Sequence, residues 1–138
     1  MTEVLVVLTI MTVVLSILLF SFFNLANYRA LEGDVAKIRS FLEEARIYTQ
    51  GSREDSSYGV YFTEKEVTLF KGESWDEREE ELRAHSFNVY VSVDTGGIGS
   101  DEVVFRRLFG EPAVSGDILV SSRGRDILIT VLSSGLME

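Results

Sequence analysis

The stretch that decides the fold of this chain begins at Thr2, ends at Phe23 and reads TEVLVVLTIMTVVLSILLFSFF. Glu3 is its only charged side chain, and the twenty residues from Val4 to Phe23 carry no charge. About 20 helical residues, each rising roughly 1.5 Å, cross the hydrocarbon core of a bilayer. The run therefore predicts a transmembrane helix over residues 1–24.

Glu3 is an energetic anomaly at the edge of such a helix. A carboxylate costs on the order of a few kcal/mol near the membrane centre. No other residue before Arg29 is charged, so the helix itself offers no partner of opposite sign. We therefore expect some group to compensate Glu3, and we take Glu3 as the candidate functional residue.

Two other interpretations of the apolar run fit less well. A cleaved secretory signal has basic residues before an apolar stretch of about 7–15 residues and a small-residue cleavage site after it. No basic residue precedes Glu3, the run is longer, and the chain continues as NLANY over residues 24–28. The core helix of a soluble protein is disfavoured because twenty uninterrupted apolar or small residues are too many.

The helical pattern continues beyond the apolar run. Apolar residues recur three or four positions apart and form one stripe that should pack on a sheet: Tyr28, Leu31, Val35, Ile38, Leu42 and Ala45. The other faces carry charges that should be solvated: Arg29, Glu32, Asp34, Lys37, Arg39, Glu43 and Glu44. We predict one helix of about 45 residues, roughly 70 Å long, whose amphipathic part covers residues 25–51. Gly51 is expected to end it in a left-handed conformation.

After Gly51 the pattern changes to the two-residue alternation of strands. Residues 52–57 predict a polar loop, and the acidic stretch 73–83 predicts a short helix or a mobile loop. Strands are predicted over residues 58–62, 67–70, 87–94, 103–109, 117–121 and 127–132. Short antiparallel strands without helices between them predict a β-rich domain over residues 52–138. The fold class is therefore α+β, with the long N-terminal helix packed on an antiparallel sheet.

Composition limits the classes of function. The 138 residues include no cysteine and one histidine, and the net charge is −9; without Glu3, 21 acidic residues face 13 basic ones, which leaves −8. This balance argues against a nucleic-acid partner, because phosphate binding requires a basic surface. The missing thiols exclude thiol catalysis and thiolate metal sites, and the single His85 leaves no histidine cluster. We therefore expect no enzyme, no cofactor and no metal.

Other clusters are interpreted as structural. The run Gly96-Gly97-Ile98-Gly99 lacks the spacing of a dinucleotide fingerprint and predicts a turn. Three carboxylates surround this turn, but their spacing does not match an EF-hand calcium loop: Asp94, Asp101 and Glu102. His85 is expected on the surface or in a loop. Four arginines are interpreted as edge charges that keep the sheet soluble: Arg106, Arg107, Arg123 and Arg125.

The segment from Thr2 to Ile10, TEVLVVLTI, closely resembles the N-terminus of type IV pilins and of type II secretion pseudopilins. Members of that family begin, after processing, with a segment of the type Phe-Thr-Leu-Ile-Glu, followed by a Val/Leu-rich helix and a β-rich domain. The C-terminal half is similar to the GspH/FimT subgroup of minor pseudopilins. That similarity lies in the segment from Phe105 to Gly110-Glu111-Pro112, in the hairpin around Arg123-Gly124-Arg125, and in the late Gly135.

The resemblance implies a minor structural subunit of a type IV pilus or a type II secretion pseudopilus. Such subunits sit in the inner membrane with the C-terminal domain in the periplasm or outside the cell. The assembly machinery of the inner membrane then moves them into a filament with other subunits. The family pattern pairs the glutamate of one subunit with the N-terminal ammonium of its neighbour, which implies that Glu3 sets the register between subunits. Membrane lipid and other pilin subunits are the implied partners.

One departure concerns processing. Family precursors carry a short basic leader ending in glycine, and the first mature residue is methylated. If Glu3 is the family's glutamate, Met1 falls at the third mature position. Either the true start lies upstream, which we expect, or the protein is not processed in the usual way. The methylated residue cannot be assigned in this sequence.

A second hypothesis keeps the anchor and omits the filament. The chain would then be a single-pass, membrane-anchored binding or sensor domain that never polymerises, which leaves Glu3 unexplained. A membrane-tethered enzyme has no supporting cluster of catalytic residues. A role in DNA uptake, with which some FimT-type proteins are associated, conflicts with the net charge.

Overall fold

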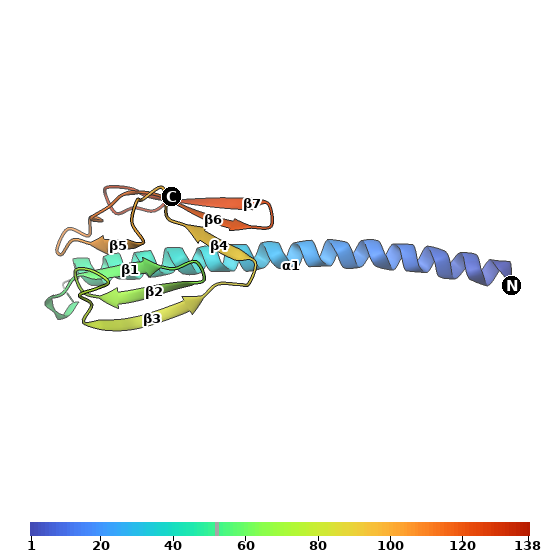
Figure 1. Ribbon diagram of the computed structural model, residues 1–138, viewed down its shortest axis with the longest axis horizontal. Coiled ribbons are helices and arrows are strands. Elements are labelled where there is room, and N and C mark those ends of the chain that lie inside the picture. The colour runs from blue at the N-terminus through green and yellow to red at the C-terminus, as the bar shows by residue number, and fades with distance from the viewer. Residues whose placement is uncertain (52) are drawn as a thin grey trace.

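The computed structural model describes residues 1–51 and 53–138, and the side chains of all of these except Phe23, Asn24 and Arg53. A long helix, α1 (Thr2–Gln50), precedes a short 3-10 turn, η1 (Arg53–Asp55). The strands that follow are β1 (Tyr58–Phe62), β2 (Glu66–Lys71), β3 (Glu80–Ser86), β4 (Val91–Asp94), β5 (Glu102–Phe105), β6 (Gly116–Ser122) and β7 (Arg125–Val131). The predicted α+β class, one long N-terminal helix followed by antiparallel sheets, is confirmed (Figure 1).

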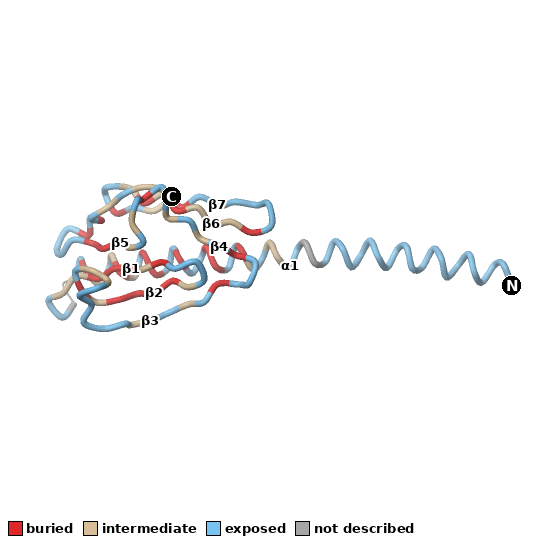
Figure 2. Tube along the Cα trace, in the orientation of Figure 1, coloured by how far each residue is buried: buried red, intermediate tan, exposed pale blue. Residues whose placement is uncertain are grey.

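Helix α1 is a single element of 49 residues, so it is about 73 Å long. Its N-terminal half projects away from the strands, and its C-terminal half lies against them (Figures 1 and 2). The helix ends where the Gly51 N–H donates to the Ile47 carbonyl oxygen at 2.9 Å. Gly51 has a φ of −71°, so the predicted left-handed ending is wrong; positive φ occurs later, at Glu54 and Asp55. Ser52 of the predicted loop lies outside the described residues.

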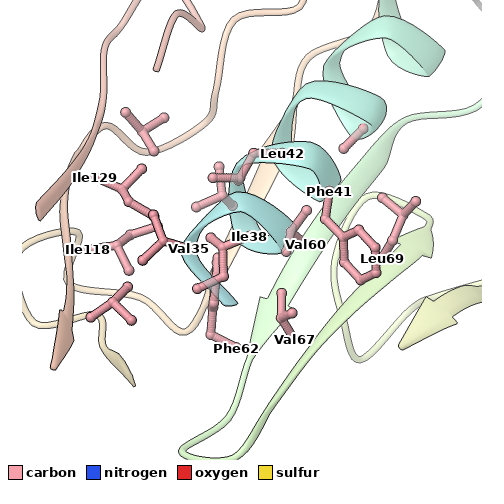
Figure 3. Close-up of a cluster of buried hydrophobic side chains, with 14 of the residues drawn as sticks. Val35, Ile38, Phe41, Leu42, Val60, Phe62, Val67, Leu69, Ile118 and Ile129 are labelled. Carbon is pink, nitrogen blue, oxygen red and sulfur yellow. The ribbon is translucent and has the colours of Figure 1, made fainter. Parts of the chain in front are cut away.

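The strands form two antiparallel sheets, with orders β3-β2-β1-β5 and β4-β6-β7. The two sheets lie on different sides of the C-terminal half of α1 (Figure 1). Val35 points toward Ile118 and Ile129 of the β6–β7 hairpin, whereas Phe41 points toward Leu69 of β2 (Figure 3). The helix is therefore covered on two sides, and its buried surface is wider than one stripe.

The last turn of α1 is fastened to the first strand through one buried hydroxyl. Thr49 Oγ1 donates to the Ala45 carbonyl oxygen at 2.7 Å and accepts the N–H of Tyr58 at 3.1 Å. Thr49 has no exposed surface. The chain reversal between helix and sheet is thus fixed at both of its ends.

The acidic stretch 73–83 is neither a helix nor wholly a loop, which corrects the prediction. Its last four residues, from Glu80 to Arg83, begin strand β3. β3 is the edge of its sheet and is mostly exposed along its length, so charged residues occupy both of its faces. An edge strand of this kind lacks the apolar alternation by which strands are recognised in sequence.

Two other strands are shorter than predicted. The strand predicted over residues 87–94 begins only at Val91, because residues 87–90 form the connection between β3 and β4. The strand predicted over residues 103–109 is β5 and ends at Phe105. Leu108, with a φ of 71°, and Gly110, with a φ of 66°, turn the chain there.

The glycine turn before β5 is present over residues 96–99. A Cβ atom on Gly97 would lie 2.4 Å from the carbonyl oxygen of Asp117 in β6. Glycine is therefore required because two backbone segments approach closely, and the turn holds the start of β6 in place.

Asp34 and His85 form a contact that corrects two predictions. Asp34 is 7% exposed although it was predicted on a solvated face of the helix. Its Oδ1 lies 2.9 Å from His85 Nε2, and its Oδ2 accepts the N–H of Asn88 at 2.9 Å. His85 therefore lies in strand β3, with its ring turned toward the helix. The carboxylate is buried because it ties the β3–β4 connection to α1.

Asp34→Ala is expected to lower the free energy of unfolding by about 1–3 kcal/mol, since the His85 ring and the Asn88 N–H lose their acceptor. Glu43→Ala removes an exposed carboxylate from the same helix and should change stability by no more than about 0.5 kcal/mol. Urea unfolding of both variants in detergent measures the difference. Equal midpoints for the two variants would contradict a structural role of Asp34.

Candidate functional site

The N-terminal half of α1 is an exposed apolar surface. Between Val4 and Phe22, its large apolar side chains keep from 49% to 72% of their area exposed (Figure 2). An 18-residue window of this helix has a mean hydropathy of 2.8, and none of it is buried. In the part of the chain that the structure describes, this is the helix long and apolar enough to cross a membrane by length and composition. We call residues 2–23 the bare half of α1.

Three hydroxyl groups of the bare half, those of Thr9, Thr12 and Ser16, are bonded to its own backbone. Thr9 Oγ1 donates to the Leu5 carbonyl oxygen at 2.7 Å, and Ser16 Oγ donates to that of Thr12 at 2.7 Å. Thr12 Oγ1 in turn lies 2.9 Å from the carbonyl oxygen of Leu8. Polar groups bonded inside the helix require no water, so these residues do not oppose burial in an apolar medium.

Glu3 lies in the first turn of α1 and is exposed. A carboxylate is favourable there because the unpaired N–H groups at a helix N-terminus carry partial positive charge. No ion pair joins Glu3 to any described residue. Its position leaves the carboxylate available to a group from another molecule.

The residues predicted to pack on the sheet lie along the C-terminal half of α1. Leu31, Val35, Ile38, Leu42 and Ala45 are each no more than 7% exposed, and Tyr28 is half-buried. Phe41, which sequence reasoning missed, is 2% exposed. The prediction of a stripe was based on one covering sheet. Phe41 lies on the helix outside that stripe, on its other covered side.

Tyr28 marks the point where α1 leaves the domain. The Arg125 guanidinium carbon lies 4.9 Å from the centre of its ring. A hydrogen bond to the Glu32 carboxylate raises the pKa of the Tyr28 hydroxyl, and the charge of Glu32 acts in the same direction. The phenol therefore stays neutral at physiological pH.

The four arginines considered together in the sequence lie in two different places. Arg107 pairs with Asp55, just beyond the end of α1. Arg123 and Arg125 lie at the β6–β7 turn, beside Tyr28. About 22 helical residues, roughly 33 Å, separate these two levels along α1, so the four side chains form no single cluster.

The carboxylates around the glycine turn serve separate local bonds. Asp94 Oδ1 accepts the N–H of Gly96 at 2.8 Å, and Asp101 Oδ1 accepts the hydroxyl of Thr95 at 2.7 Å. Glu102 Oε2 accepts a backbone N–H from Trp75, in the loop between β2 and β3, at 2.6 Å. Among the described residues, no group of three His, Cys, Asp or Glu side chains is placed to hold a metal ion.

Comparison with known proteins shows which solved structures share this fold. No family model and no curated protein matches the sequence. Two matching solved structures are both of EpsH, a minor pseudopilin of the type II secretion system of Vibrio cholerae. The first has a TM-score of 0.62 at 10% identity and covers 80% of this chain and 92% of that one. The second has a TM-score of 0.59 at 8% identity and covers 79% of this chain and 94% of that one. The chain therefore shares the pilin-like fold of a minor pseudopilin.

Proposed function

We propose that this chain is a minor pilin or pseudopilin, a non-catalytic structural subunit of a type IV pilus or a type II secretion pseudopilus. The observation that carries the proposal is the bare half of α1, which ends in a lone carboxylate and projects from a pilin-like domain. An exposed apolar surface of this size requires a partner, because it is unfavourable in water. Lipid before assembly, and the helices of other subunits after it, would both cover it.

The dimensions of the bare half support the membrane stage. The twenty residues from Val4 to Phe23 span about 30 Å as a helix, which equals the hydrocarbon thickness of a typical bilayer. The backbone of α1 is bonded within the helix, as a lipid-exposed segment requires. In this arrangement Glu3 lies at one face of the membrane, and the β domain lies beyond the other, in the periplasm or the cell exterior.

The filament stage gives Glu3 its role. When the helices of many subunits pack together, the carboxylate is desolvated and must be paired. Pairing with the N-terminal ammonium of a neighbouring subunit satisfies it at one axial offset, because a sliding of the helices would leave both charges unpaired. The ion pair therefore determines the register between subunits more than it strengthens their overall affinity. Machinery in the inner membrane would extract the subunit and add it to the filament.

The test measures where the wild-type chain is located in cells that assemble filaments. Shearing removes filaments from the cell surface and leaves membrane proteins behind. We expect the chain in the sheared fraction together with other pilin-like subunits, and an unrelated single-pass inner-membrane protein only in the membranes. Recovery of the chain solely as a membrane monomer, in cells whose filaments are present, would favour the anchored binding or sensor domain.

A further inference from the structure

The end of the β domain that faces the bare half of α1 carries a group of stacked arginine and tyrosine side chains. The β6–β7 turn and the connection between β3 and β4 reach furthest along the helix toward its N-terminus (Figure 1). A groove at this level is lined by Asn27, Tyr28, Leu31, Ser122, Arg123 and Arg125. We call Tyr28, Tyr90, Arg123 and Arg125 the collar.

The collar consists of two cation–π pairs. The Arg123 guanidinium carbon lies 3.6 Å from the ring centre of Tyr90, and that of Arg125 lies 4.9 Å from the ring centre of Tyr28. A guanidinium over a ring face is attracted to the ring through its charge, and its N–H donors can bind acceptors elsewhere. The two arginines are thus held in place with their donors available.

Within the described ranges, no carboxylate is paired with these donors. None of the ion pairs between described residues involves Arg123 or Arg125, whereas Arg78, Arg83 and Arg107 each pair with a carboxylate. Both collar arginines are exposed. Their donors therefore point to a partner outside the chain that presents acceptor oxygens.

The charges of the domain are separated along its length. The loop between β2 and β3, within the acidic stretch 73–83, lies at the end of the domain far from the bare half (Figure 1). The charged residues nearest to the collar in the sequence are Arg29, Glu32 and Asp126, and Glu64, Lys65 and Glu66 line a pocket together with Val89. The acidic stretch and the collar therefore lie at opposite ends of a domain whose net charge is −8 (Figure 1).

The length of the bare half determines how far the collar lies from the hydrocarbon core of the bilayer. If the bilayer core ends near Phe23, Tyr28 lies five residues further, or about 7.5 Å, which is within the headgroup layer. Tyr90 of the collar is 50% exposed, and its neighbour Val89 is 92% exposed. Tyrosine rings and exposed apolar side chains are favoured at that depth, and arginine binds phosphate there.

We propose that the collar binds the headgroups of the bilayer in which the chain is anchored, with Arg123 and Arg125 donating to lipid phosphates. Tyr28, Tyr90 and Val89 lie in the interface beside them. The contact fixes the tilt of the domain on the membrane before assembly, and it must be released when the subunit leaves the bilayer. This inference rests on the anchoring step of the proposed function and is independent of the filament.

The test uses tryptophan fluorescence of the full chain in lipid vesicles. Trp75 is the sole tryptophan and belongs to the β2–β3 loop, so the wild type reports the far end of the domain. The double variant Trp75→Phe, Tyr90→Trp reports the collar instead. With a nitroxide quencher on the lipid headgroup, we expect strong quenching of the collar reporter and little quenching of the wild type.

Arginine dependence is tested by adding Arg123→Gln and Arg125→Gln to the collar reporter. We expect quenching to fall by about half or more, and its increase with the anionic lipid phosphatidylglycerol to disappear. The matched control adds Arg39→Gln and Arg106→Gln, which remove the same charge from exposed positions away from the collar. The control should behave like the reporter itself.

Three outcomes would overturn the proposal. The first is equal quenching of the collar reporter and the wild type in vesicles to which both are bound. The second is quenching that is unaffected by the two collar substitutions. The third is a collar signal that is lost when protein is diluted in lipid, which would assign the surface to a second copy of the chain. A chain that does not sediment with the vesicles contradicts the anchoring step, on which the proposed function also depends.

Discussion

Glu3→Ala is expected to leave the chain in the membrane fraction and to remove it from sheared filaments. Membrane insertion depends on residues 4–23, which the substitution does not change, and loss of a carboxylate makes insertion slightly easier. In the filament, the substitution leaves the neighbour's ammonium buried without a partner, at a cost of about 3–5 kcal/mol. That cost corresponds to a loss of incorporation of about a hundredfold or more.

The control for Glu3→Ala is Glu43→Ala, which removes an exposed carboxylate from the same helix outside the bare half. It should be incorporated like the wild type, so that loss of an acidic residue is separated from loss of this one. The measurement is the ratio of chain in the sheared and membrane fractions. Wild-type incorporation of Glu3→Ala would refute the register mechanism, although it would leave the anchor intact.

Ile38→Ala is expected to destabilise the domain by about 2–5 kcal/mol, because it opens a cavity in a core that cannot fully collapse. Ile38 has no exposed surface and lies where the helix meets the β1–β2 sheet (Figure 3). A domain of this size has about 5–15 kcal/mol of stability in total, so a large fraction would be lost.

The same helix supplies a matched control for this prediction. Ile47→Ala makes the identical chemical change at a residue that is 58% exposed, and it should alter stability by no more than about 0.5 kcal/mol. Urea unfolding in detergent can be followed by Trp75, whose ring stacks on Tyr61 with centroids 4.2 Å apart. Similar unfolding midpoints for the two variants would show that the packing of α1 between the sheets is not what stabilises the domain.

The elements with clear periodicity could be predicted from the sequence. The three-to-four spacing of α1 and the alternation in β6 and β7 reflect their buried positions. β1 and β2 are buried along most of their length, and they were predicted as short apolar runs on either side of a polar turn. Strand β3 could not be found because it is an exposed edge whose charges interrupt the alternation. Phe41 was missed because the apolar stripe implies one covering sheet. That a second sheet covers the helix depends on the tertiary structure.

The polar contacts were less accessible to sequence reasoning. Asp34 has the composition of a solvated face, and its burial depends on His85 and Asn88, more than fifty residues away. Glu3 was found because a single charge beside an apolar run is conspicuous without any structure. Arg123 and Arg125 were noticed as charges, but only the topology places them level with Tyr28 and opposite Tyr90.

The way in which α1 is held has a mechanical consequence. From Leu31 to Thr49 the helix lies lengthwise against the strands, and Thr49 bonds its last turn to the start of β1. A pull on the bare half therefore acts parallel to this contact and loads every packed residue at the same time. Peeling breaks contacts one after another, whereas in this shear geometry the contacts share the force and no single one breaks first. A motor that drags the helix out of the bilayer would thus carry the folded domain along with it.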